Sequence, residues 1–277
     1  RINDEDFLTA ENKLLFKEMG IELMFYPEKI AADEIAAQLK HTSTSESMDF
    51  AHGKLQIALF KLDENSPLLD LRLSEIVSKM TPQEASQMRI IALSRNDETV
   101  IPNSDTKFQY NDLVYTVATR EGLSTLVKYF GASNVVVSNV MIYGGGAIAE
   151  MVASMLSKQG IKVKLIEESR ERCLELTEKL PDEVAIVNGD GRDSDFLFEE
   201  GIRDCDAFIS LTGGDETNVL ACVVAKKFGV PRTVAEVENI EYIRLAEEMG
   251  VDTVINKKLI TASRIFKFTL SGTARFV

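Results

Sequence analysis

The chain has 277 residues, of which 45% are hydrophobic and 27% are charged, and its formal net charge is −13. This length suffices for about two domains of ordinary globular composition. No apolar run reaches the roughly 18 to 20 residues that span a bilayer, and an acidic chain repels a phosphate backbone, so the composition argues against a membrane-spanning segment and against nucleic acid as a partner.

The first 41 residues resemble a segment near the end of the chain. Glu18–Phe25 is similar to Glu248–Ile255, at an offset of 250 − 20 = 230 residues between Gly20 and Gly250. At the same offset three further pairs are identical: Ile30 and Ile260, Ala32 and Ala262, Ile35 and Ile265. This shared apolar register favours an internal repeat over two unrelated helices of similar composition.

The repeat predicts how the two ends of the chain are organised. We expect residues 1–41 to be the tail of one unit whose start is missing, and the segment that includes residues 255–277 to be the same tail of the next unit, whose continuation is missing. Segments 28–40 and 258–270 are typical of helices with an apolar face. Such a face needs a partner, so we expect a second copy of the chain to cover both segments in a homo-oligomer.

Residues 42–131 are predicted to form a small α+β domain that follows a polar linker at 42–48. Strands are expected at 54–61, 89–93, 99–101 and 113–118, with helices near 71–77 and 123–130. The choice rests on period-2 apolar patterns in the strands and helical spacing in the two remaining segments. The predicted order is β-α-β-β-β-α.

Residues 132–254 are predicted to form a second, Rossmann-like domain with a doubly wound parallel sheet. Strand candidates are 135–143, 163–166, 185–187, 207–211 and 233–237, and helix candidates are 148–156, 174–180, 195–200 and 218–228. Regular alternation of strands and helices indicates an α/β fold whose parallel sheet is covered on both faces.

A glycine turn joins the first of these strands to the first helix. Its pattern over Gly144–Ala149 is G-x-G-x-x-A, and the strand after the helix ends at Glu167. This is one form of the dinucleotide-binding βαβ unit, in which the turn and the start of the helix face a pyrophosphate. The predicted cofactor-binding residues of this turn are Gly144, Gly145, Gly146, Ala147 and Ile148. Gly144 allows the tight turn, and the N–H groups of the last three face the pyrophosphate.

Two charged residues near the end of the second strand are further candidates. The Glu167 carboxylate can accept hydrogen bonds from ribose hydroxyls and disfavours a 2′-phosphate, which favours NAD or an adenosine nucleotide over NADP. The alternative is a solvated acid at a strand end. Arg170 can reach the adenine or a phosphate, although an exposed helix arginine explains it equally well.

Two later loops complete the predicted site. Asp190, between Gly189 and Gly191, can accept from the adenine amino group while the glycines give backbone access, or it is only a turn residue. Thr212 and Gly213 follow the fourth strand at the same sheet edge, where a doubly wound fold forms its ligand crevice. The alternative for this loop is that Asp215 or Thr217 only caps the helix that follows.

No catalytic constellation accompanies these residues. The two histidines, His41 and His52, lie outside the nucleotide domain. The cysteines, Cys173, Cys205 and Cys222, lack metal-ligand spacing and are expected to be free thiols in a reducing cytosol. Hydride transfer needs a placed acid or base and a substrate domain. We therefore expect no enzyme and no metal; an NAD-dependent oxidoreductase and a structural fragment that binds no ligand are the alternatives.

Four segments together resemble a known family: Tyr143–Ala149, Lys164–Cys173, Asn188–Gly191 and Leu211–Asn218. They are similar to the TrkA family, the RCK-domain (or KTN-domain) regulatory subunits of bacterial Trk-type potassium uptake systems. Residues 54–130 resemble the small RCK C-terminal subdomain of that family. The resemblance implies that residues 1–41 are the tail of a truncated first Rossmann domain and that residues 255–277 are a crossover helix toward a missing second C-terminal subdomain. Two departures are Ala149 in place of the last glycine and Gly213-Gly214 where the family often has polar residues.

The resemblance implies a regulatory function. It implies binding of NAD(H) or of ATP or ADP, with contacts at Gly144, Gly146, Glu167, Asp190 and Thr212. It implies self-assembly into a dimer or ring and a cytoplasmic location, peripheral on the inner face of the cell membrane. The implied partner is a Trk-type membrane potassium transporter subunit, gated by ligand-dependent rearrangement of the ring.

Overall fold

The computed structural model of the chain describes residues 2, 7, 9–21, 24–40, 46–50, 55–62, 66–95, 98–130 and 137–273. These residues form two compact units. We call Arg1–Leu39 with Val137–Val277 the parallel unit, and Lys40–Val136 the antiparallel unit, after their sheets. His41, His52 and most of the predicted 42–48 linker lie outside the described residues.

The parallel unit is built on a six-stranded sheet with the order β11-β10-β9-β6-β7-β8, in which every paired strand is parallel. Its strands are β6 (Asn139–Tyr143), β7 (Lys162–Glu167), β8 (Val184–Asn188), β9 (Ala207–Ser210), β10 (Arg232–Glu236) and β11 (Thr253–Ile255). The chain adds strands in one direction from β6 to β8 and then in the other direction from β9 to β11. This reversal confirms the predicted doubly wound sheet and places its switch point between β6 and β9.

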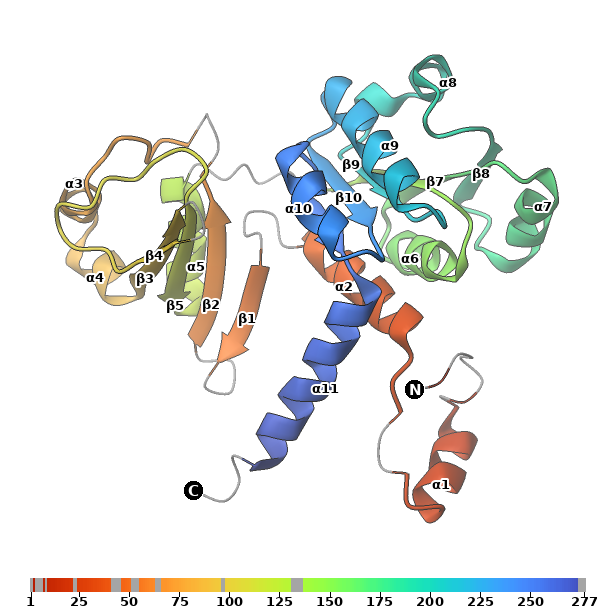
Figure 1. Cartoon of the computed structure of the whole chain (residues 1–277), viewed down its shortest axis with the longest axis horizontal. Helices are drawn as coiled ribbons and strands as arrows, with labels where there is room; N and C mark the ends of the chain where they lie inside the picture. The colour runs from red at the N-terminus through yellow and green to blue at the C-terminus, as the bar shows by residue number, and fades with distance from the viewer. Residues whose placement is uncertain are drawn as a thin grey trace. The chain divides into compact units, whose positions relative to one another are not determined.

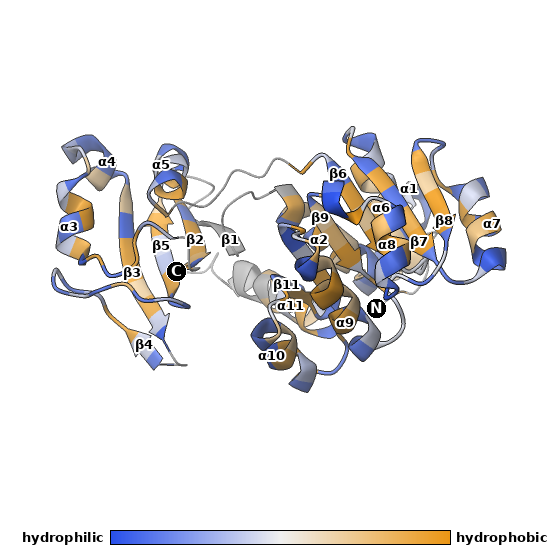
Figure 2. Ribbon diagram, turned by 90° about the horizontal axis from the view of Figure 1, so that it is seen from above, coloured by the Kyte–Doolittle hydropathy of each residue, from blue (hydrophilic) through white to orange (hydrophobic). Residues whose placement is uncertain are grey.

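Helices cover both faces of this sheet (Figure 1). One face carries α2 (Pro27–Lys40), α6 (Ala147–Lys158) and α7 (Arg170–Lys179), and the other carries α8 (Ser194–Glu199), α9 (Asp215–Lys227) and α10 (Glu241–Glu248). Strand β6 is buried from both sides: Ile142 packs on the first face, and Met141 and Tyr143 on the second. Burying one such side chain contributes roughly 1.5–3 kcal/mol, which explains why the strands are mostly hydrophobic (Figure 2).

Helix α2 reaches this core from the N-terminal segment of the chain. Ala31, Ala32 and Ile35 are fully buried against the sheet, and Arg232 donates to the backbone oxygens of Gln38 and Leu39 at 3.4 Å. The expectation that a second copy covers segment 28–40 is therefore wrong, because this chain covers the apolar face of that segment itself.

The C-terminal helix α11 (Lys257–Thr273) is the repeat partner of α2. The two helices begin at Lys257 and Pro27, which are 257 − 27 = 230 residues apart, the offset found in the sequence. Likewise α10 and α1 (Ala10–Glu18) end at Glu248 and Glu18. Unlike α2, helix α11 is exposed over residues 262–266: Ile260 packs on the core, whereas Phe266 is 63% exposed.

The antiparallel unit contains a five-stranded sheet with the order β1-β2-β5-β3-β4. The strands are β1 (Glu46–Phe50), β2 (Leu55–Lys61), β3 (Met88–Arg95), β4 (Glu98–Val100) and β5 (Leu113–Ala118), and the helices are α3 (Leu73–Ser78), α4 (Pro82–Ser86) and α5 (Arg120–Phe130). Phe60 and Phe130 stack at 4.2 Å between ring centroids in its core. The α+β class was predicted correctly, and both sheets have their expected strand types.

Several elements were missed. Strand β1 overlaps the end of the predicted linker, because an edge strand needs only backbone pairing with β2 and its polar sequence hides it. Helix α4 carries a readable signal, the capping box of Thr81 and Glu84 with Pro82 at the first position. In the parallel unit α10 and β11 were not predicted, and β11 runs across the proposed boundary at residue 254.

A buried ion pair holds the loop before β5. The Asp112 carboxylate has no exposed surface and accepts from Nε and Nη2 of Arg95, both at 2.7 Å, and from the Gln109 N–H at 2.8 Å. A carboxylate removed from water in this way stays stable only while these donors remain in place. The pair therefore ties strand β3 to the loop before strand β5.

We predict that Asp112→Ala lowers the local stability of the antiparallel unit by about 2–3 kcal/mol, because it leaves the Arg95 guanidinium and a backbone N–H without their acceptor. Hydrogen exchange of the β3 and β5 amides measures this loss in the unit itself. Asp105→Ala is the matched control, since Asp105 pairs with Arg72 at an exposed site and costs less than about 1 kcal/mol. Equal loss of protection in the two variants would contradict the assignment.

Candidate functional site

A cleft of about 380 Å³ opens at the carboxyl ends of β6, β7 and β9. It is lined by Tyr143, Gly144, Gly145, Gly146, Glu167, Glu168, Arg192, Leu211, Thr212, Gly213 and Thr217. The cleft lies at the switch point of the sheet, where open α/β proteins bind their ligands.

The predicted site residues divide into two groups. Six of them line the cleft: Gly144, Gly145, Gly146, Glu167, Thr212 and Gly213. The other six lie outside its lining: Ala147, Ile148, Arg170, Gly189, Asp190 and Gly191. Ala147 and Ile148 form the first turn of α6 directly after the lining residue Gly146, and Arg170 is an exposed residue at the start of α7.

The glycines of the β6–α6 turn are required for different reasons. Gly144 has φ +101°, and a Cβ there would lie 2.7 Å from the Leu211 oxygen. A Cβ on Gly145 would lie 2.7 Å from Leu176 Cδ1. A Cβ on Gly146 would meet only the Leu211 oxygen, at 3.9 Å. The backbone therefore requires glycine at position 144. A side chain at position 145 would have to displace the ends of the Leu176 and Glu167 side chains, whereas the space beside Gly146 is open to a ligand.

Helix α6 begins at this open space without a capping side chain. Its N-cap residue is Gly146, and among the described residues no side chain makes a capping hydrogen bond. The first N–H groups of a helix have no partner within the helix and carry the positive end of its dipole. The residues present at this end of the cleft thus fit an anionic group such as a diphosphate.

Glu167 fixes the position of the turn. Its Oε2 accepts from the Gly145 N–H and its Oε1 from the Ser169 N–H, each at 2.7 Å. The Gly145 N–H is therefore already used, and the amides left for a ligand begin at Gly146. Each carboxylate oxygen has two lone pairs, so Glu167 retains the capacity to accept from a hydroxyl.

Arg172 supports the turn from behind, a role that the sequence did not indicate. Its Nε donates to the Gly145 oxygen at 2.8 Å, and Nη2 donates to Glu150 at 2.9 Å. These bonds connect α7 with α6 and with the glycine turn. The sequence drew attention to Arg170 instead, because periodicity alone does not show which of two neighbouring arginines faces the turn.

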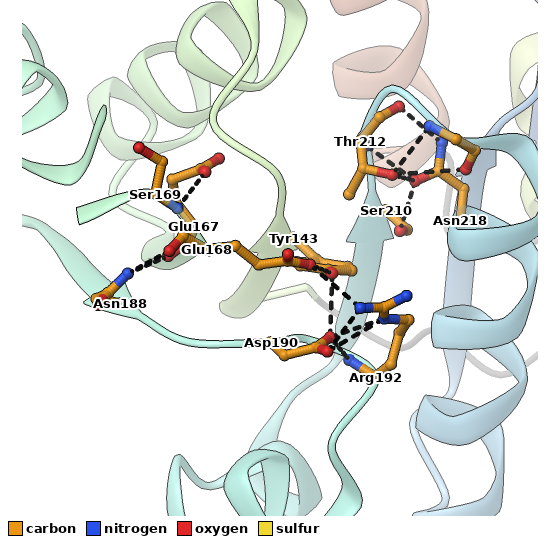
Figure 3. A network of polar contacts seen from close by, with 11 residues as sticks. Tyr143, Glu167, Glu168, Ser169, Asn188, Asp190, Arg192, Ser210, Thr212 and Asn218 are labelled. Atoms are coloured by element: carbon orange, nitrogen blue, oxygen red, sulfur yellow. Dashed lines mark hydrogen bonds and ion pairs between the residues drawn. The ribbon is translucent and has the colours of Figure 1, made fainter. Parts of the chain in front are cut away.

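A cluster of polar side chains lies where β6 and β8 end (Figure 3). The Tyr143 hydroxyl is in hydrogen-bonding contact with Glu168 and lies 3.1 Å from Asp190 Oδ1. Arg192 binds both oxygens of Asp190, with Nη2 at 2.7 Å from Oδ2 and Nε at 2.9 Å from Oδ1. Hydrogen bonds from Arg192 lower the pKa of Asp190 to about 2, and burial first of all raises the pKa of Tyr143.

The two glycines beside Asp190 have a packing role. A Cβ on Gly189 would lie 2.3 Å from the Phe196 ring, and a Cβ on Gly191 would lie 2.4 Å from the Tyr143 ring. From the sequence, both glycines were predicted to give a ligand access to the backbone. In the structure aromatic rings fill the space next to both glycines.

Asn218 sets the position of Thr212. This amide is 1% exposed, and its Oδ1 accepts from the N–H and the hydroxyl of Thr212 at 2.8 and 2.7 Å. Its Nδ2 donates to the backbone oxygen of Glu236 at 2.8 Å. The sequence signal for Asn218 is a polar side chain on the apolar face of a predicted helix. Asp215 does not cap α9; it accepts from the N–H groups of Glu238 and Asn239.

The cysteines and the acidic side chains show no further site among the described residues. Cys173, Cys205 and Cys222 are buried free thiols, and burial raises the pKa of Cys205 to about 11. Within the described ranges no cluster of histidine, cysteine and acidic side chains has the arrangement of a metal site. None of the described helices combines the length and the apolar content that crossing a membrane requires.

Comparison with known proteins finds relatives of both units. Residues 140–257 match the TrkA-N domain and residues 57–131 match the TrkA-C domain. A Trk system potassium uptake protein, trkA homolog 1 of Methanosarcina mazei, is 28% identical over 254 residues, which cover 91% of this chain and 61% of that protein. The chain thus spans less than two thirds of the length of this relative.

Solved structures share the fold. The crystal structure of the GsuK RCK domain has a TM-score of 0.62 at 18% identity and covers 97% of this chain and 56% of that one. The GsuK channel bound to NAD has a TM-score of 0.55 at 19% identity, covering 86% and 41%. With the predicted motifs, the matched domains and these folds in agreement, the chain belongs to the TrkA family, with a TrkA-C domain followed by a TrkA-N domain.

Proposed function

We propose that this chain is a nucleotide-binding regulatory module of a Trk-type potassium uptake system. In this proposal an adenine nucleotide or NAD(H) occupies the cleft, and its binding gates a membrane potassium transporter by rearranging a ring of RCK domains. The observation that carries the proposal is the open space beside Gly146 at the uncapped start of α6. Relatives named as potassium uptake proteins and the NAD-bound GsuK channel support it.

The proposed ligand contacts follow from the cleft. The diphosphate would bind the amides of Gly146, Ala147 and Ile148. The ribose hydroxyls would donate to Glu167, whose charge, next to that of Glu168, disfavours the 2′-phosphate of NADP. Thr212 would contact the ligand from the opposite wall, where Asn218 holds it.

A set of polar contacts connects the cleft with the two repeat helices. Asn218 links Thr212 to the backbone of Glu236. The Glu236 carboxylate lies 3.8 Å from Lys257 Nζ at the start of α11, and Lys257 lies 3.6 Å from Glu28 in the first turn of α2. We propose that this Asn218–Glu236–Lys257 connection passes ligand binding to α2 and α11.

The electrostatics of this connection make it sensitive to small displacements. Burial raises the pKa of Glu236, and Lys257 partly offsets that rise. Glu28 Oε2 is buried without a hydrogen-bond partner among the described residues, and Glu238 lies 3.7 Å from the same Lys257 Nζ. One ammonium group thus serves three carboxylates, so a movement that favours one of them weakens its interaction with the others. Ligand binding would act by its differential affinity for the two arrangements.

The proposed setting is the cytoplasmic side of the membrane, with the transporter subunit and further copies of this chain as partners. The exposed part of α11 is available for such contacts. We propose no catalytic role. The acidic side chains and the tyrosine of the cleft have structural partners. Glu167 accepts hydrogen bonds from backbone amides, and the Tyr143 hydroxyl is hydrogen-bonded to Glu168.

Gly146→Ala tests the proposed diphosphate contact. The added methyl group meets no atom nearer than 3.9 Å, so the fold is retained, but the methyl fills the space through which a diphosphate approaches. We expect ADP and NADH to bind at least roughly 10-fold more weakly by titration calorimetry, a loss of about 1.4 kcal/mol or more.

Arg244→Ala is the control. It removes an exposed side chain of α10 outside the cleft lining, and we expect its affinity to stay within about twofold of the unchanged chain. Equal affinity in Gly146→Ala and the unchanged chain, or no binding of either nucleotide to the unchanged chain, would contradict the proposal.

The second prediction concerns Lys257→Met. A fluorophore attached to Ser263→Cys on the exposed part of α11 reports its environment, since the three native thiols are buried. We expect ADP to change the fluorescence of this probe, and Lys257→Met to suppress that change and shift the ADP affinity about 2- to 10-fold by linkage.

Lys258→Met separates this effect from loss of surface charge. Lys258 is 66% exposed and its ion pair is with Glu238. The connection would be refuted by a ligand response that survives in Lys257→Met, or by one that Lys258→Met suppresses to the same extent.

A further inference from the structure

We infer that Arg192 recognises the base of the bound nucleotide by stacking its guanidinium plane on the adenine ring, and that Asp190 serves to position Arg192. This inference rests on the proposed function, because it requires a nucleotide in the cleft. It replaces the sequence-based hypothesis that Asp190 itself accepts from the adenine amino group.

The first support is the place of the two side chains. Arg192 lines the cleft together with Glu168, whereas Asp190 does not. Both oxygens of Asp190 are occupied: Oδ2 by Nη2 of Arg192, and Oδ1 by Nε, by the backbone N–H of Arg192 at 2.8 Å and by the Tyr143 hydroxyl. Figure 3 shows the carboxylate of Asp190 turned toward the guanidinium group. A ligand therefore meets the arginine first.

The second support is the geometry of the guanidinium group. Two of its nitrogens, Nε and Nη2, bind one carboxylate, the fork arrangement that fixes an arginine side chain. The side chain is nonetheless 46% exposed. A guanidinium group that is held by its edge and open to solvent offers its flat face, and arginine stacks on aromatic rings with that face.

The third support is the charge balance, which argues against a phosphate contact. The Arg192 cation is neutralised by Asp190, and Glu168 Oε1 lies 3.6 Å from Nη2. Because the pKa of Asp190 is lowered to about 2, its carboxylate stays ionised at neutral pH. One cation and two carboxylates leave a local charge of about −1, which repels a phosphate and is indifferent to an uncharged base.

The fourth support is the order of the groups along the sheet. Strands β6, β7 and β8 are neighbours, and they end in the uncapped helix amides, in Glu167 and in the Arg192 loop respectively. With strands about 4.8 Å apart, the first and third of these groups are separated by on the order of 10 Å. A diphosphate, a ribose and a purine follow one another over a similar span.

The test measures ADP affinity of the full chain by titration calorimetry in four variants: Arg192→Ala, Arg192→Lys, Gly146→Ala and Arg244→Ala. Lysine keeps the charge but lacks the flat face. We expect both Arg192 variants to weaken ADP binding by a similar factor, roughly 5- to 100-fold. Arg244→Ala removes an exposed arginine of α10 outside the cleft lining and should leave the affinity unchanged.

The possible results separate this inference from the proposed function. If Arg192→Lys binds ADP like the unchanged chain, the stacking assignment is overturned, whether or not Arg192→Ala binds more weakly; a weakened Gly146→Ala in the same series leaves the proposed function standing. If the unchanged chain binds neither ADP nor NADH, both proposals fail. Thermal unfolding of each variant checks that the fold is retained.

Asp190→Asn tests the positioning role through a double-mutant cycle. In the chain that keeps Arg192, we expect Asp190→Asn to weaken ADP binding about 3- to 10-fold, because the guanidinium plane is no longer fixed. In the Arg192→Lys background we expect no further effect. An equal loss in both backgrounds would show that Asp190 acts on the ligand independently of Arg192 and would overturn the assignment.

Discussion

The pair of hydrogen bonds from backbone amides to Glu167 is the constraint on which the site depends. One bond fastens the Gly145 N–H to the end of β7, and the other holds the Glu167 carboxylate to the Ser169 N–H. With Arg172 on the Gly145 oxygen, the two peptide groups that flank the Gly145 Cα are both held. The turn is thus held by its own neighbours, and it places Gly146 in the cleft lining at the start of α6, where none of the described side chains caps the helix. Preorganised donors of this kind bind an anion without first having to be ordered.

The rest of the parallel unit positions this edge. The switch between β6 and β9 creates the opening, Asn218 sets Thr212 on one wall, and Arg192, bound by Asp190, lies at the other end. The same Asn218 reaches Glu236 and thereby the lysine between α2 and α11. The helices that repeat in the sequence are thus connected to the residues that line the cleft, an arrangement suited to regulation.

The sequence predicted what depends on local pattern. The Gly144–Ala149 turn, the strand that ends at Glu167 and the alternation of strands and helices follow from spacing, and the structure has them where they were expected. Contacts between distant segments could not be read in this way. The burial of α2, the fork between Arg192 and Asp190, and the choice of Arg172 over Arg170 each depend on which side chains meet in three dimensions. Strand β1 was missed because backbone pairing alone defines it.

A crystal structure of this chain with ADP tests the central claim most directly. The account predicts diphosphate oxygens within hydrogen-bonding distance, about 2.7–3.2 Å, of the Gly146, Ala147 and Ile148 amides, with Glu167 on the ribose. ADP bound elsewhere on the chain, or a cleft that holds no ADP at saturating ADP concentration, would contradict it.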